Sequence, residues 1–188
     1  MTRRTLISIA TFTILCPSTA LATLIPRIAI TTEDDGSIDA ATLARLTSRI
    51  SGALLRSNHF QVVDRARLSA ALREQGLSNS AYADPKTAAS LGKIVGASRI
   101  LHLFMSIEAS ESSGAYLTTH QVDAAASFTL VGVDTARIVA AGNASGSAQR
   151  QAAGSGEQYS AAMLRREAVD ACADDIVVQI DVPVGDRK

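Results

Sequence analysis

The sequence predicts an α/β domain of the α+β type, in which a mixed sheet of about five strands packs with about four helices. Strand-like runs and helical periodicities alternate in the first half of the chain. Three strand-like runs then follow one another, and a helical segment closes the order. The early strand–helix–strand crossover favours parallel pairing, and the later meander favours antiparallel pairing, so the sheet is expected to be mixed.

The first strand and the first helix have clear boundaries. Residues 27–32 form a β-prone run, and the polar residues 33–37 end it. The helix is predicted over 39–57, with Asn58 closing it. Its buried face is expected to comprise Leu43, Leu46, Ile50, Ala53 and Leu54, because these residues recur at intervals of three and four. Arginines between them, at 45, 49 and 56, are left for solvent.

Two shorter helices are predicted after a β-prone run at residues 60–63. Asp64 is placed to cap the first of them, and Gly76 is placed to end it in the left-handed conformation. The inner positions of this helix are expected to be Leu68, Ala71, Leu72 and Gln75. Asp84, followed by a proline, starts the next helix, and Gly96 ends it.

The second half of the chain predicts an antiparallel meander followed by a helix. The strands are expected at residues 99–107, 125–133 and 137–144, with a tight hairpin at 134–137. Residues 110–119 are interpreted as a polar, mobile connection that extends the flanking strands, and residues 142–156 as a flexible Gly/Ala/Ser loop. The last helix is predicted over 158–180, with Leu164, Ala168, Ala171, Cys172 and Val178 as inner positions.

The N-terminus is typical of a secretory signal peptide over residues 1–22. Arg3 and Arg4 precede a short apolar run, and the pattern of Ala20 and Ala22 predicts cleavage after Ala22. The run is too short and too often interrupted for a permanent membrane span. The remaining residues, 23–188, are predicted to form a single domain in the periplasm.

The two cysteines bear on anchoring and on disulfides. Cys16 follows an apolar run, but the bulky Leu15 before it argues against lipidation, so we do not expect a lipoprotein. Cleavage would remove Cys16 and leave Cys172 alone, without a partner for an intramolecular disulfide. Cys172 is most simply a small buried helix residue.

The charge balance gives no indication of nucleic-acid binding. The whole chain carries 18 basic and 18 acidic residues, and loss of Arg3 and Arg4 leaves 16 basic against the same 18 acidic residues. Proteins that bind nucleic acid carry a basic patch that releases counterions from phosphates. We therefore expect no nucleic-acid partner.

Several phrases resemble a family of cell-envelope modules. Residues 57–65 read SNHFQVVDR, residues 73–78 read REQGLS, and residues 88–98 read AASLGKIVGAS. Residues 130–138 and 171–177 match the family's hairpin and final-helix phrases in part. In this order, the phrases resemble the fold shared by the curli component CsgG, the penicillin-binding-protein activator LpoB and the N-terminal domain of TolB.

The resemblance implies a non-enzymatic periplasmic binding or assembly module, accessory to envelope secretion or to cell-wall or exopolysaccharide assembly. It implies an envelope protein partner, self-assembly, or both, and peripheral association with the outer membrane. The departures matter: the lipidated cysteine and Pro-rich tether of LpoB and the propeller of TolB are not expected here, and Ala136 replaces the hairpin glycine. The same scaffold serves different activities, so the site needs a separate argument.

The alternative reading is a periplasmic hydrolase with a histidine-centred site. Such an enzyme needs a nucleophile, a base and an orienting group within hydrogen-bond reach. His59, His102 and His120 lie in no convincing motif: His59 is expected in a turn, His102 within an apolar strand and His120 at a strand start. The possible ligand residues are not spaced as in a metal site or a cofactor site, so we expect no metal and no cofactor. We predict no catalytic residues.

The predicted contact surface is the connection at residues 110–119 with the sheet edge that it joins, because envelope assemblies often pair main chains at sheet edges. Its predicted contact residues are Ser110, Glu111, Tyr116 and Thr119. An ordinary solvated hairpin is the alternative for this segment.

Overall fold

The computed structural model describes residues 25–74, 84–114, 117–153 and 160–181, so the predicted leader lies outside it. The elements in chain order are β1 (Arg27–Asp34), α1 (Ala40–Ser57), β2 (Gln61–Val62), α2 (Arg65–Glu74), α3 (Pro85–Val95), β3 (Arg99–Ser113), β4 (Leu117–Gly132), β5 (Arg137–Ala153) and α4 (Ala161–Asp181). The sheet order is β2-β1-β3-β4-β5. β1 pairs in parallel with β2 and β3, and the other pairs are antiparallel, which confirms the mixed sheet.

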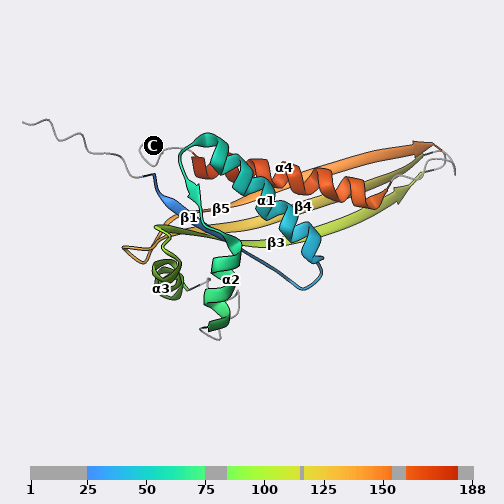
Figure 1. The fold of residues 1–188 in the computed structure, drawn as a ribbon. Coiled ribbons are helices and arrows are strands. Elements are labelled where there is room, and N and C mark those ends of the chain that lie inside the picture. The colour runs from blue at the N-terminus through green and yellow to red at the C-terminus, as the bar shows by residue number, and fades with distance from the viewer. Residues whose placement is uncertain (1–24, 75–83, 115–116, 154–159, 182–188) are drawn as a thin grey trace, which may run out of the picture.

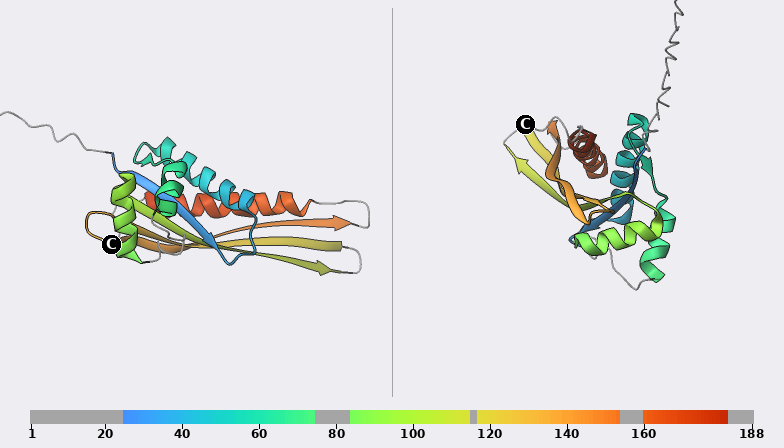
Figure 2. Two further views of the ribbon diagram at one scale, coloured as in Figure 1. Left: turned by 60° about the horizontal axis from the view of Figure 1, so that its bottom comes forward. Right: turned by 90° about the vertical axis from the view of Figure 1, so that its left-hand side faces the viewer.

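The helices form two unequal layers on the sheet. α1 and α4 cover one face, and α2 and α3 cover the other face at the end near the start of β1 (Figure 1). β3, β4 and β5 extend well past α2 and α3, as the left view in Figure 2 shows. The far half of this three-stranded region therefore has a helix on one face only.

The first helix forms as its sequence predicts. The Asp39 carboxylate accepts a hydrogen bond of 2.8 Å from the amide of Thr42, and Asn58 closes the helix in the left-handed conformation. The predicted face is correct at its centre, because Leu46, Ile50 and Leu54 are fully buried. In the other two predicted helices, Leu68, Ala71 and Leu72 are buried, and Asp84 and Gly96 cap α3. Gln75 and Gly76 lie outside the described residues.

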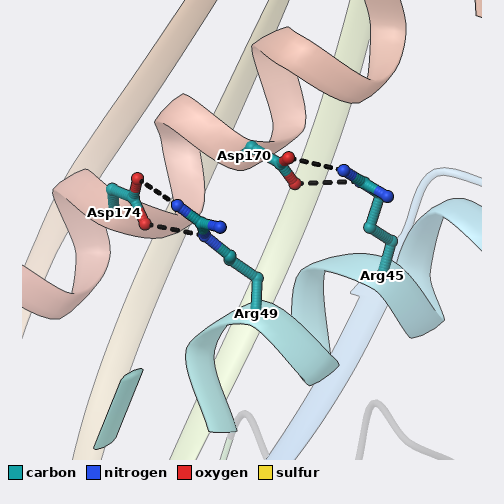
Figure 3. A network of polar contacts seen from close by, with 4 residues as sticks. All are labelled: Arg45, Arg49, Asp170 and Asp174. Atoms are coloured by element: carbon teal, nitrogen blue, oxygen red, sulfur yellow. Dashed lines mark hydrogen bonds and ion pairs between the residues drawn. The ribbon is translucent and has the colours of Figure 1, made fainter. Parts of the chain in front are cut away.

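Two arginine–aspartate pairs connect α1 with α4 (Figure 3). Arg45 donates to Asp170, and Arg49 donates to Asp174 with N–O distances of 3.0 and 2.9 Å. Each pair is bidentate, which fixes orientation better than a single contact. The arginines, predicted to face solvent, are partly exposed but also set the register of the two helices, which run in the same direction.

β5 carries small residues on the face that α4 covers. Ala140, Gly142, Ala144, Gly146 and Ala148 alternate along this face. At Gly146, an added Cβ would lie 2.2 Å from the carbonyl oxygen of Ala168 and 2.4 Å from the amide nitrogen of Cys172. Only glycine permits such an approach of the helix backbone to the strand.

Two polar segments are strand over most of their length. Residues 110–119 extend both flanking strands, as the sequence analysis allowed, because β3 reaches Ser113 and β4 starts at Leu117. The prediction of a flexible loop at residues 142–156 was wrong, because β5 continues as strand as far as Ala153. Pairing with β4 and packing under α4 override the weak strand propensity of Gly, Ala and Ser.

The inner face of α4 was predicted in part. Leu164, Ala168 and Cys172 are buried as expected, and burial raises the pKa of the Cys172 thiol to about 11. Ala171 and Val178 were predicted to face inward, but both are exposed. The buried stripe instead also includes Val169, Ala173, Ile176 and Ile180, because the helix turns a broader face to β4 and β5.

We expect Gly146→Ala to destabilise the protein by about 1–3 kcal/mol, because the new methyl group would press against the backbone of α4. Urea unfolding followed by circular dichroism measures the change. Ser147→Ala is the matched control, since Ser147 is exposed on the same strand and should change stability by less than about 0.5 kcal/mol. Equal stabilities for the two variants would show that α4 does not approach β5 this closely.

Candidate functional site

Within the described parts of the chain, the far part of β3 is a strand edge without a neighbouring strand on one side. β1 pairs with β3 only as far as Met105, opposite Asp34, whereas β3 continues to Ser113. The amide of Gly114 donates to the carbonyl of Leu117 on the β4 side. Backbone groups alternate in direction along a strand, so those of Ala109, Glu111 and Ser113 point away from β4.

The opposite edge of the sheet, on β5, is partly capped by side chains. The amide of Ser145 donates to Asp175 of α4 at 3.1 Å, and Gln179 of α4 donates to the carbonyl of Asn143 at 2.9 Å. Both caps depend on the short distance between α4 and β5. Over the described residues, no such cap covers the outward groups of Ala109, Glu111 or Ser113, so the two edges differ in their capacity to pair with another chain.

The structure divides the predicted contact residues between two faces of the sheet. Ser110 pairs with Gln121, Glu111 with His120, and Ser112 with Thr119. Ser110 and Thr119 therefore face the side without a helix in this region, and Glu111 faces the side of α4. Tyr116, the remaining predicted residue, lies outside the described residues.

A row of polar side chains with an acidic residue at each end crosses the sheet at this end, on the α4 side. The Nδ1 atom of His120 lies 3.4 Å from a carboxylate oxygen of Glu111. His120 is opposite Arg150 in the β4–β5 register, and Arg150 donates to both carboxylate oxygens of Glu167 at 3.0 Å. These contacts connect β3, β4, β5 and α4 beyond the apolar core. His120 was not predicted as part of the site.

A hollow of about 260 Å³ lies between this row and the first turn of α4. Its apolar side is formed by Ala109, Val122, Ala161 and Leu164, and its polar side includes Glu111 and His120. A smaller hollow of about 110 Å³ adjoins the same strand at Ile107 and Ala109, next to Ile38 and Arg165. Both hollows therefore follow the open edge of β3.

The arrangement does not support the histidine-centred alternative. His102 is buried on β3, where its Nδ1 lies 3.1 Å from the hydroxyl oxygen of Thr31, and its Nε2 lies 3.7 Å from Glu33. His59 is exposed after α1, and neither it nor His102 lines the hollows described here. Ser110 faces away from His120, so the two do not form a nucleophile–base pair.

No group of three or more metal-ligating side chains is present among the residues that the structure describes.

A further hollow of about 290 Å³ lies between the N-terminal turns of α1 and α4. Two of its arginines already have acidic partners, since Arg45 pairs with Asp170 and Arg165 lies 3.5 Å from Asp39. The open β3 edge is thus the stronger candidate.

The layered fold and the open edge define a class of protein, a small α+β domain that presents a long unpaired strand edge to solvent. The chain belongs to the CsgG family: the family model described as curli production assembly/transport component CsgG matches residues 33–182. This match confirms the resemblance inferred from the sequence phrases.

Solved structures are similar at low sequence identity. The C-terminal domain of LpoB from Salmonella enterica is 21% identical, with 64% of this chain and 82% of that chain covered and a TM-score of 0.41. Lipoprotein GNA1162 from Neisseria meningitidis is 16% identical, with 82% and 97% covered and a TM-score of 0.47. No curated protein matches the sequence. None of the helices in the described part of the chain is long and apolar enough to cross a membrane.

We expect acidification to destabilise the protein through His102. Burial lowers the pKa of His102 below its ordinary value of 6.5, and Glu33 only opposes this shift. A lowered pKa in the folded state favours the neutral ring, so this contribution is present above about pH 6.5 and is lost as the pH falls through the folded-state pKa.

Urea unfolding between about pH 7 and pH 5 measures this effect. The free energy of unfolding should fall more steeply for the natural chain than for His102→Asn, which does not titrate. The carboxylates of Asp39, Asp84 and Asp174 have pKa values below 3.8 and act at lower pH. Parallel pH profiles for the two proteins would contradict the burial of a neutral His102.

Proposed function

We propose that the chain is a non-enzymatic binding and assembly module of the periplasm, accessory to envelope secretion or to cell-wall or exopolysaccharide assembly. Membership of the CsgG family supports a role in the cell envelope. The observation that carries the proposal is the unpaired edge of β3, which exposes backbone donors and acceptors beyond Met105. Such an edge binds another protein through main-chain hydrogen bonds.

The proposed location depends on the leader. Residues 1–22 are proposed to direct export and to be removed after Ala22, leaving a chain that begins at Thr23 and carries no lipid. The partner in the periplasm is an envelope protein or a further copy of the chain. The proposed contact surface is the far end of β3 and β4, with Ser110, Glu111 and Thr119, together with Tyr116, which lies outside the described residues.

Photo-crosslinking in intact cells tests the proposal. A photoreactive amino acid at Ser110, which is exposed on β3, is expected to give a discrete protein adduct in the envelope fraction. Lys93 is the matched control, because it is exposed on α3 near the opposite end of the sheet. Mass spectrometry of the adduct identifies the partner and also the first residue of the chain.

Two results would contradict the proposal. If no adduct forms at Ser110, or if the same adducts form at Ser110 and at Lys93, the proposed contact surface is contradicted. A chain recovered from the cytosol with its leader attached would contradict the proposed export. A chain with an acylated Cys16 would contradict the proposed cleavage after Ala22 and the absence of a lipid.

A further inference from the structure

We propose that the open edge of β3 binds an extended segment of a partner protein with the alternating pattern apolar–basic–apolar. The inference rests on the proposed function for the existence of a partner, and it adds the edge, the binding mode and the chemistry of the ligand. β1 leaves the sheet after Asp34, so no strand of the described residues lies beside β3 from Ile107 to Ser113. An added strand continues the sheet there.

Backbone geometry limits the length and position of the segment. The outward groups of Ala109, Glu111 and Ser113 recur every second residue, at about 6.5–7 Å. A segment of about five to seven residues pairs with them in full. The β5 edge is less suitable, because Asp175 and Gln179 already occupy the amide of Ser145 and the carbonyl of Asn143.

Two hollows provide places for alternate side chains of the segment. The smaller lies at Ile107 and Ala109, and the larger lies at Ala109 and Glu111, on the same face of the sheet. Their spacing along β3 is that of side chains two residues apart in an extended chain. Ile38 and Ile107 form the apolar side of the first hollow, whose other side is polar, with Ser37 and Arg165. Val122 and Leu164 make the second hollow largely apolar.

The residue between the two apolar side chains points to the other face of the sheet. On that face, β3 presents the exposed carboxylate of Glu108, opposite Asp123 of β4. Two acidic side chains at this position favour a lysine or arginine in the segment, and they disfavour an acidic residue. Charge complementarity therefore selects a basic central residue.

Peptide binding to the full mature chain tests the inference. The probe is a fluorescein-labelled octapeptide with valine and leucine on either side of a central lysine, among serines and threonines. Fluorescence anisotropy is expected to show saturable binding with a dissociation constant below about 1 mM. The same peptide with a central glutamate should bind at least about threefold more weakly, and the peptide with alternate amides N-methylated should not bind.

Variants of the chain identify the edge. Ala109→Pro removes an outward amide of β3 and should weaken binding at least about tenfold, whereas Ser147→Pro makes the same change at the β5 edge and should not. Ala161→Phe should also weaken binding, because it fills the larger hollow. Glu108→Lys, an exposed change that leaves the fold intact, should reverse the preference between the lysine and glutamate peptides.

Several results would overturn the inference. Absence of saturable binding, equal effects of Ala109→Pro and Ser147→Pro, or an unchanged charge preference in Glu108→Lys would each contradict it. Self-association of the chain that excludes the peptide would identify a second copy as the occupant and would also overturn it. If crosslinks form at Ser110 while the peptide fails to bind, the proposed function stands and only the extended segment is refuted.

Discussion

The close contact between α4 and β5 at Gly146 determines which backbone groups at the β5 edge are capped. Because a side chain at Gly146 would overlap the backbone of Ala168 and Cys172, the helix lies directly against the strand. From this position, Asp175 and Gln179 reach the backbone of β5 and cap it. The same contact buries Cys172 and completes the core on this face.

The two sides of the long three-stranded region consequently differ. One side is covered in part by side chains of α4, and the other is the β3 edge that β1 leaves after Asp34. The first turn of α4 also forms one wall of the hollow at Glu111 and His120. A single helix therefore caps part of one edge and forms a wall of the hollow beside the other edge.

The helices and the order of elements could be predicted from the sequence, because their signals are local. Asp39 and Asp84 are capping residues, and Leu46, Ile50 and Leu54 show helical spacing. The far halves of β3 and β5 could not be predicted, because serine, glycine and alanine have weak strand propensity and acquire it from their neighbours. Glu111 was predicted on a loop, and its contact with His120 depends on a strand register that the sequence does not reveal.

Amide hydrogen exchange measured residue by residue tests the difference between the two edges most directly. The amide of Ser145, capped by Asp175, should exchange at least about tenfold more slowly than that of Glu111, relative to the rates of the unstructured chain. Exchange of Glu111 as slow as that of Ser145 would show that the β3 edge is covered. Exchange of Ser145 as fast as that of Glu111 would show that α4 leaves the β5 edge open, and either result would contradict the account.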